Sequence, residues 1–323
     1  MGIPSYFAHV VRRHRRIIKR ADPKRNPIDN LYMDCNSLIY DAVREIEPPA
    51  AGAEGTTDFE RRLIAEVCRR IEHYVRVLQP SSRLFIAFDG VAPVAKLDQQ
   101  RSRRFKSWVQ ARTLEMLDGA KPTGWSSVTI TPGTAFMREL DATVRRRMHG
   151  KKKVGGMRLE HVVVTGPTEP GEGEHKIYEY IRNNPEHHSG TSTVIYGMDA
   201  DLFMLTLNHL HVAPRAFLYR EMPDFIRSLD KSLDPNKGYL VDIPVFAEAL
   251  ATDLVGGRKC APSERDAVIS DYIVLCFMLG NDFMPHFPSL NIRTEGIDRL
   301  MGAYTSVVAS KNKRIVDMKL ERL

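Results

Sequence analysis

The sequence predicts an α/β fold in which a mostly parallel, twisted sheet is flanked by helices on both faces. Short, continuous apolar runs are typical of strands that are buried on both sides of a parallel sheet. Longer segments with helical periodicity separate these runs, and this alternation is the pattern of doubly wound α/β proteins. With 323 residues the chain is long enough to bury a large core without disulfide bonds.

The expected elements follow from periodicity and from turn residues. We expect strands at 30–34, 83–89, 161–165, 193–197 and 216–219. Helical spacing of apolar residues predicts helices at 6–18, 58–78, 94–117, 134–148, 174–182, 245–254, 264–279 and 297–308. Glycine, proline and polar residues predict surface loops at 47–57 and 150–156, and an irregular excursion at 220–238. No sharp change in composition divides the chain, so we expect a single domain over residues 1–323.

Charge and cysteine usage narrow the class of protein. The formal charge of +7 comes from 47 Lys and Arg against 40 Asp and Glu, which suits a polyanionic substrate. The four cysteines have no metal-ligand spacing, and Cys35, Cys68 and Cys276 lie within apolar patterns, so we interpret these three as core residues in a reducing compartment. The longest apolar run, Tyr272–Leu279, is too short to span a membrane. We expect an intracellular protein, cytoplasmic rather than nuclear.

Seven acidic residues follow or interrupt apolar stretches in separate parts of the sequence. They are Asp34, Asp89, Glu172, Glu174, Asp199, Asp201 and Asp282. An unpaired carboxylate is costly to bury, and the carboxyl ends of parallel strands meet at one edge of the sheet. Lys176 is the only basic residue within these motifs. The pattern therefore predicts a catalytic site with two Mg²⁺ ions, for which Mn²⁺ can substitute, that cleaves phosphodiesters. The alternative is that each Asp caps a helix.

A basic stripe follows Asp89 in the sequence. Its members are Lys96, Gln100, Arg103 and Arg104, whose spacing of i, i+4, i+7 and i+8 places them on one helix face. The arginine fork matches phosphate oxygens, so the stripe predicts a phosphate-binding site, with a solvated basic face as the alternative. Phe105 and Trp108 lie on the same predicted helix, and we interpret them as core anchors rather than as base-stacking residues.

These motifs together make the chain resemble the catalytic N-terminal region of the Xrn-type 5′→3′ exoribonucleases. The matching segments are MGIPSYF, NLYMDCNSLIY, FDGVAPVAKLDQQRSRRF, ITPGTAFM, TGPTEPGEGEHKI, YGMDADLFML and LGNDFMPHFPSL. The resemblance implies a PIN/flap-nuclease-like fold and a two-Mg²⁺ site formed by the seven acidic residues. It also implies that the basic stripe binds a 5′-monophosphate. The expected reaction is hydrolysis of single-stranded RNA from its 5′ end, with release of nucleoside 5′-monophosphates.

Certain features depart from the family pattern. Tyr40 stands where the family usually has a histidine that is thought to stack on a base, and tyrosine can stack too. Asp98 replaces a usually neutral residue in the phosphate-binding helix. The family also has a second conserved region that closes the site, and the chain ends at Leu323, near where that region would begin. We therefore expect a short or truncated member, completed by a missing C-terminal region or by a protein partner.

Two other functions stay open at this point. A flap-type DNA endonuclease shares the acidic cluster, but its glycine-rich helix–turn–helix has no counterpart in the sequence that follows Asp282. A catalytically weak or inactive RNA-binding scaffold would keep the fold without turnover. Retention of all seven acidic residues favours the enzyme over the scaffold.

Overall fold

The computed structural model describes residues 5–49, 55–118, 124–221, 231–234 and 237–316, which divide into two units. The first, here called the central unit, is the continuous segment Asp22–Tyr180. The second, here called the terminal unit, combines Met1–Ala21 with Ile181–Leu323. The expectation of a single domain stays a prediction.

The central unit is built on three parallel strands. They are β2 (Asn30–Asp34), β3 (Arg83–Ala87) and β6 (His161–Thr165), in the order β2-β3-β6. Asp34 pairs with Ala87, and Ala87 pairs with Thr165, so the three strands end in register. Residues that follow these strands therefore emerge at one edge of the sheet, here called the carboxyl edge.

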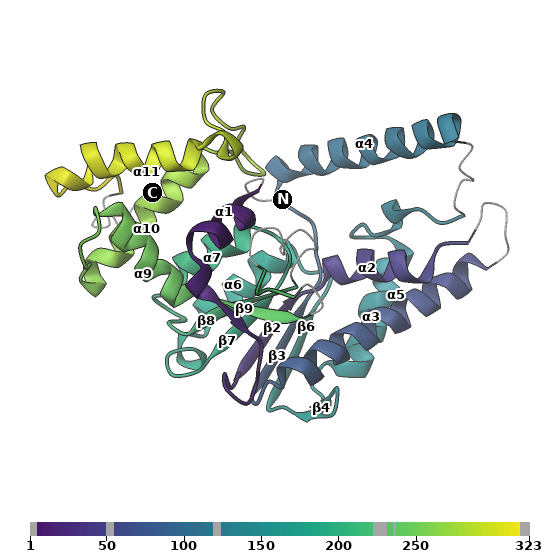
Figure 1. The fold of residues 1–323 in the computed structure, drawn as a ribbon. Coiled ribbons are helices and arrows are strands. Elements are labelled where there is room, and N and C mark those ends of the chain that lie inside the picture. Colours follow the sequence, from purple (N-terminus) through teal and green to yellow (C-terminus); the bar gives the residue numbers. More distant parts are fainter. Residues whose placement is uncertain (1–4, 50–54, 119–123, 222–230, 235–236, 317–323) are drawn as a thin grey trace. The chain divides into compact units, whose positions relative to one another are not determined.

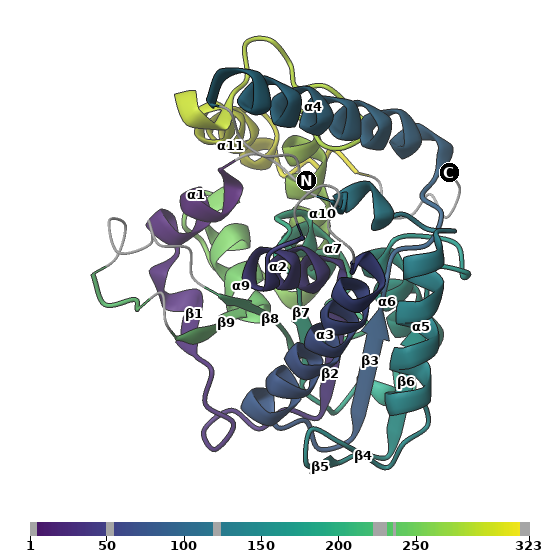
Figure 2. The ribbon, with the colours of Figure 1, turned by 90° about the vertical axis from the view of Figure 1, so that its right-hand side faces the viewer.

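Helices connect the strands of the central unit. They are α2 (Asn36–Ile46), α3 (Thr56–Leu78), α4 (Val94–Asp118), α5 (Ala135–Met148) and α6 (Gly173–Asn183), with a 3-10 turn at Ser127–Thr129. Helices α3 and α5 lie along one face of the strands (Figures 1 and 2). Tyr180 of α6 packs against Tyr32 and Phe85 on the strands themselves, at ring-centroid distances of 5.8 and 4.8 Å. Helix α4 extends away from α2 and α5 (Figure 1).

A small hairpin occupies part of the predicted loop at 150–156, so that prediction was wrong. Strands β4 (Lys153–Val154) and β5 (Met157–Arg158) pair antiparallel. The two residues between them, Gly155 and Gly156, have φ angles of +57° and +89°. Two left-handed residues are what a tight two-residue hairpin turn requires. A side chain at Gly155 would also meet the carbonyl oxygen of Glu72 at 2.7 Å.

The terminal unit contains four strands of mixed direction. They are β1 (Ile18–Arg20), β7 (Thr193–Tyr196), β8 (Ala216–Glu221) and β9 (Gly238–Asp242), in the order β1-β9-β8-β7. Strands β7 and β8 are parallel, whereas β9 runs antiparallel to both β8 and β1. Lys19 of β1 also forms an ion pair with Asp242 at the end of β9.

Helices of the terminal unit bury an aromatic core. They are α1 (Tyr6–Arg13), α7 (Asp201–Asn208), α9 (Ile243–Leu254), α10 (Pro262–Phe277) and α11 (Gly296–Val307), with 3-10 turns at Arg15–Ile17, Pro185–His187, Ile292–Thr294 and Ala309–Lys311. Phe203 packs edge-on against Tyr6 and Phe246. Asp271 is completely buried and accepts hydrogen bonds from the Tyr304 hydroxyl (2.6 Å) and from the N–H groups of Ile315 and Val316 (3.0 and 2.7 Å).

The predicted α/β class, with a mostly parallel sheet flanked by helices, is confirmed. The five expected strands and seven of the eight expected helices occur with small shifts at their ends, whereas α2, α7, β1, β4, β5 and β9 were not predicted. The helix expected at 6–18 was wrong in its second half: α1 ends at Arg13, and Ile18 begins β1. Thr56 already belongs to α3, while residues 50–54 of the expected loop lie outside the described residues. The expected excursion at 220–238 begins as β8 and ends as β9, and residues 222–230 and 235–236 lie outside the described residues.

The four cysteines are free and buried, which confirms the prediction for Cys35, Cys68 and Cys276. None of the helices within the described ranges combines the length and the apolar character needed to cross a membrane.

Candidate active site

Four of the predicted acidic residues lie at the carboxyl edge of the central unit. Asp34 is the last residue of β2, and Asp89 follows β3 by two residues. Glu172 precedes α6 and Glu174 lies in its first turn, after β6. Carboxylates favour a helix N-terminus because the helix dipole is positive there. The prediction that these acids are carried by the ends of neighbouring strands is thus met within this unit.

Two of these acids form a cluster with a histidine. One ligand atom from each of Glu172, Glu174 and His175 lies within 4.8 Å of the others, and both glutamates are buried. The Oε2 atom of Glu172 is buried and accepts no hydrogen bond, with His175 Nδ1 at 3.6 Å. Buried carboxylate oxygens gathered in this way fit a hard divalent cation such as Mg²⁺ or Mn²⁺. The residues present therefore fit the predicted metal.

Asp89 is held from two sides. Its Oδ1 accepts a hydrogen bond from the Gly173 N–H (2.8 Å), and its Oδ2 accepts one from the side-chain amide of Asn36. The pKa of Asp89 is raised, mainly because burial disfavours its charged form. The hydrogen bond from Gly173 and the nearby lysines oppose this rise, whereas the charge of Glu172 adds to it. A cation would offset the cost of burying this charge. Asn36 was missed by the sequence reasoning, although it lies within the NLYMDCNS motif.

The glycine between the two glutamates is required by the site. A Cβ atom at Gly173 would lie 2.6 Å from Oδ1 of Asp34. Real Cβ atoms essentially never come so close, so any side chain would push Asp34 or the start of α6 aside. The GEGE pattern therefore encodes a close approach of backbone to carboxylate in addition to two candidate metal ligands.

Lys176 has a structural position rather than a substrate-facing one. Its buried Nζ donates hydrogen bonds to the carbonyl oxygens of Phe88 (2.8 Å) and Gly166 (2.7 Å). These carbonyls belong to the segments that leave β3 and β6. The pKa of Lys176 is lowered, mainly by burial, although the charges of Glu169, Asp89 and Asp141 oppose this change. Lys176 thus joins two strand ends beneath the acidic cluster.

The predicted basic stripe lies on α4, which begins beside the cluster. Lys96 is buried, and its Nζ lies 2.7 Å from Oε1 of Glu172. Gln100 and Arg104 are half-buried, and Arg103 is exposed. The departure at Asp98 leaves the stripe unobstructed, since its side chain is 76% exposed and pairs with Arg101 at 3.0 Å.

Tyr40 of α2 lies close enough to the stripe to interact with it electrostatically. The pKa of Tyr40 is raised, mainly by burial. The charges of Arg103 and Arg104 oppose this rise, and the charge of Asp89 adds to it. The residue is still 42% exposed, so part of it is accessible to a ligand. The stripe, Tyr40 and Asp89 therefore belong to one region of the central unit.

The interpretation of Phe105 and Trp108 as core anchors was wrong. Their side chains are 65% and 61% exposed. The helical pattern of α4 was recognised correctly, but nothing in the described part of the central unit covers this part of the helix: every residue from 105 to 114 is exposed.

The other three predicted acids lie in the terminal unit. Strand β7 ends at Tyr196, Asp199 is exposed in the following loop, and Asp201 is the first residue of α7. Both acids thus follow the strand, and Asp201 opens a helix. Asp282 follows α10 in a turn in which the side chain of Asn281 accepts hydrogen bonds from the N–H groups of Phe283 and Met284.

Arg220, near the end of β8, is a further residue that the sequence reasoning missed. Burial lowers the pKa of its guanidinium to about 10, and the charge of Asp199 raises it. The guanidinium carbon lies 4.4 Å from the ring centroid of Phe7, a cation–π distance.

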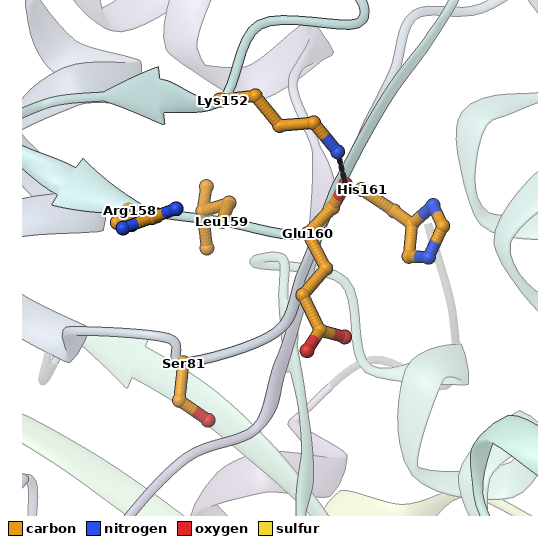
Figure 3. Close-up of a pocket in the computed structure, with 6 residues that line it drawn as sticks. All are labelled: Ser81, Lys152, Arg158, Leu159, Glu160 and His161. Atoms are coloured by element: carbon orange, nitrogen blue, oxygen red, sulfur yellow. Dashed lines mark hydrogen bonds between the residues drawn. The ribbon is translucent and has the colours of Figure 1, made fainter.

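A separate cavity of about 430 Å³ lies at the opposite edge of the central unit (Figure 3). It is lined by Ser81, Lys152, Arg158, Leu159, Glu160 and His161. Ser81 precedes β3, and His161 begins β6, so the cavity lies at the amino ends of these strands. Lys152 Nζ donates to the Glu160 carbonyl inside it (2.9 Å), as Figure 3 shows. The acidic cluster is not part of this cavity.

Known proteins similar to this chain are exoribonucleases. The 5′-3′ exoribonuclease 1 of Schizosaccharomyces pombe is 32% identical over 332 residues, which cover 96% of this chain and 24% of that protein. The 5′-3′ exoribonuclease 1 of Saccharomyces cerevisiae is 32% identical over 307 residues, which cover 90% of this chain and 20% of that protein. The 5′-3′ exoribonuclease 2 of Aspergillus oryzae is 29% identical, covering 94% and 36%. The chain thus spans about a third or less of these relatives.

The fold is similar to a solved structure of the catalytic core of Rad2 in complex with DNA substrate, with a TM-score of 0.48 and 15% sequence identity. The match covers 93% of this chain and 68% of the Rad2 chain. Two family models match the sequence itself. The model described as the Xrn1 helical domain matches residues 262–323. The model described as the XRN 5′-3′ exonuclease N-terminus matches residues 1–221, more than half of the chain. The chain therefore belongs to the XRN 5′-3′ exonuclease family.

Proposed function

We propose that this chain is a metal-dependent 5′→3′ exoribonuclease. Its substrate would be single-stranded RNA with a 5′-monophosphate, and its products nucleoside 5′-monophosphates. The observation that carries the proposal is the cluster of Glu172, Glu174 and His175 beside half-buried Asp89, with Lys96 and the rest of the basic stripe on the adjoining helix.

The acidic residues would hold two divalent ions, Mg²⁺ or Mn²⁺. Within the central unit the ligands would be Asp34, Asp89, Glu172 and Glu174. Asp199, Asp201 and Asp282 of the terminal unit would complete the ligand set, as the resemblance of their motifs implies. When bound, these ions supply an activated water and stabilise charge on the attacking and leaving oxygens of a phosphodiester.

The basic stripe would set which bond is cleaved. Arg103 and Arg104 present guanidinium forks to the 5′-phosphate, while Gln100 donates through its amide. Lys96 is the member of the stripe that contacts the cluster, because its Nζ lies 2.7 Å from Oε1 of Glu172. A terminal phosphate held there would place the first internucleotide bond beside the acids. Tyr40, which is 42% exposed, would stack on the first base.

End recognition is tested with matched RNAs that carry a 5′-monophosphate, a 5′-hydroxyl or a 5′-triphosphate. With Mg²⁺ we expect rapid loss of the monophosphorylated RNA and release of mononucleotides. Arg103→Gln with Arg104→Gln should raise KM for that RNA and reduce the preference for its end, whereas Lys151→Gln, exposed in the loop after α5, should not. Equal degradation of all three RNAs by the unchanged chain would refute end recognition.

Metal-dependent turnover separates this proposal from a binding scaffold. EDTA and the Asp199→Ala, Asp201→Ala double variant should each abolish hydrolysis while RNA binding persists. If the unchanged chain binds RNA with Mg²⁺ but does not hydrolyse it, the scaffold function is correct for this chain alone. Adding the remainder of a longer relative, or a partner from the same cell, then tests whether the site needs completion. Selective cleavage of branched DNA would instead favour the flap-endonuclease alternative.

A further inference from the structure

The outer part of α4 carries two large aromatic side chains that the fold does not bury. Phe105 and Trp108 are 65% and 61% exposed. Their rings lie nearly parallel, with an interplanar angle of 24° and centroids 6.1 Å apart. Neighbouring exposed aromatic groups form an apolar patch, and such patches mark interaction sites.

The aromatic pair lies between two arginines on the same stripe of the helix. Arg101, Phe105, Trp108 and Arg112 are spaced i, i+4, i+7 and i+11, so their side chains follow one line along α4. Arg101 pairs with Asp98, but both side chains are highly exposed and such surface pairs are weak. A phosphate can therefore compete for Arg101.

The charge of this segment selects the kind of ligand. Residues 99–114 include five basic residues, Arg101, Arg103, Arg104, Lys106 and Arg112, and no acidic residue. A groove-binding protein helix would need a continuous apolar stripe, whereas here cations bracket the rings. Aromatic faces alternating with cations are the arrangement with which proteins bind single-stranded nucleic acid.

We propose that Phe105 and Trp108 form a second contact site for single-stranded RNA, in which bases stack on the rings while Arg101 and Arg112 bind neighbouring phosphates. This inference rests on the proposed function for the identity of the strand, and it concerns a site beyond the 5′-phosphate pocket. An α-helix rises about 1.5 Å per residue, so the rings lie roughly 14 and 18 Å along α4 from Lys96. A dinucleotide held at the stripe does not reach them, whereas a longer strand does.

Trp108 itself reports binding. The chain has two tryptophans, and the other, Trp125, is buried against Phe59. Trp125→Phe therefore leaves Trp108 as the single fluorophore. In EDTA, 5′-phosphorylated RNA of about twelve nucleotides should quench its emission, while a dinucleotide should not. Unchanged emission when anisotropy of labelled RNA shows saturation would overturn the proposal.

Variants test the energetic contribution. Phe105→Ala with Trp108→Ala should raise KM for the longer RNA about tenfold, or about 1.4 kcal/mol, without changing dinucleotide hydrolysis. Leu114→Ala is the matched control, because Leu114 is 53% exposed on the opposite side of α4. An unchanged KM in a double variant with the circular dichroism of the parent would contradict the inference. So would a loss of self-association, measured by sedimentation, that leaves RNA binding intact, because the pair would then contact protein.

Salt dependence tests the arginines. Each lost phosphate contact lowers the slope of log K against log salt by about 0.7 for a single strand, so Arg101→Gln with Arg112→Gln should lower it by about 1.4. An unchanged slope would remove the two arginines from the site.

Because binding is measured in EDTA, failure of the nuclease proposal and failure of the second contact site can be told apart. If the chain hydrolyses no RNA but Trp108 is quenched, the nuclease proposal fails and the second contact site stands. Hydrolysis without quenching supports the nuclease and refutes the second contact site.

Discussion

Asn36 and Asp89 hold each other through two hydrogen bonds that join the start of α2 to the segment after β3. The amide of Asn36 donates to Oδ2 of Asp89, and the N–H of Asp89 donates to Oδ1 of Asn36 (3.1 Å). The remaining oxygen of Asp89 is held by Gly173. The side-chain amide of Asn36 thus fixes both the backbone and the carboxylate of Asp89, a predicted metal ligand.

Asn36→Ala should therefore reduce activity without touching the substrate directly. We expect kcat to fall about tenfold or more, because groups that hydrogen-bond to metal ligands typically change affinity or activity by about 10–100-fold when they are removed. Raising the Mg²⁺ concentration should restore part of the activity, which a merely destabilising change would not show. Asn26→Ala, in the loop before β2, is the control. Identical Mg²⁺ dependence in the parent and in Asn36→Ala would argue against this positioning role.

Gly173→Ala adds only one methyl group, but it should reduce activity strongly. The added methyl group would lie 2.6 Å from Asp34 Oδ1, so either Asp34 or the first turn of α6 must move. Activity should fall at least about a hundredfold, since small misplacements of catalytic groups have effects of that size. Gly190→Ala has open space around it and should be nearly neutral. Full activity of Gly173→Ala would mean that the contact with Asp34 is unimportant.

Lys176→Met should act mainly on stability. The methionine fills similar volume but leaves the carbonyls of Phe88 and Gly166 without this donor. We expect a loss of about 2 kcal/mol in the free energy of unfolding, measured with urea in EDTA. Lys106→Met removes an exposed lysine and should change it by less than about 0.5 kcal/mol. Equal stability of the two variants would show that Lys176 does not join the strand ends energetically.

Divalent cations should stabilise the chain through Glu174. A ligand at a hundred times its Kd adds about 2.7 kcal/mol, so saturating Mn²⁺ or Mg²⁺ should raise the midpoint of thermal unfolding by several degrees. Glu174→Gln should remove most of this shift because an amide is a poorer ligand for a hard cation. Glu179→Gln, exposed on the same helix, should keep it. A shift that persists in Glu174→Gln would place the ion elsewhere.

In the terminal unit, Asp271→Ala should cost about 3 kcal/mol of stability. The substitution leaves the Tyr304 hydroxyl and two backbone N–H groups without their acceptor and opens a small cavity. Asp266→Ala, on an exposed side of the same helix, should be close to neutral. Denaturant unfolding of the two variants decides the matter, and a cost below about 1 kcal/mol would show that the chain readily satisfies these donors otherwise.

The parts of the fold that could be predicted from sequence are those in which the local pattern coincides with burial. Strands β2 and β6 were located to the residue because each is a continuous apolar run bounded by turn residues. Strand β1 could not be found this way, since Ile18 is its only apolar residue and its pairing with β9 is a tertiary property. The hairpin around Gly155 needed knowledge that both glycines are left-handed.

The candidate site shows the same division. Acidic residues after strands predicted the carboxyl edge, because topology forces strand ends together. Asn36 and Lys176 could not be assigned from their types alone, since an amide and a lysine have many uses and only contacts reveal which one applies. The error at Phe105 and Trp108 has a related cause: helical spacing defines a face but not what covers it.

The pairing of Ile18 with Val241 affects the order in which parts of the chain fold. Once strand β1 has left the ribosome, it has no partner until more than two hundred further residues have been synthesised. Meanwhile the parallel strands of Asp22–Tyr180 are already available to one another. Because neighbouring segments associate sooner than remote ones, the inserted part is expected to collapse first, with the two flanking segments joining last.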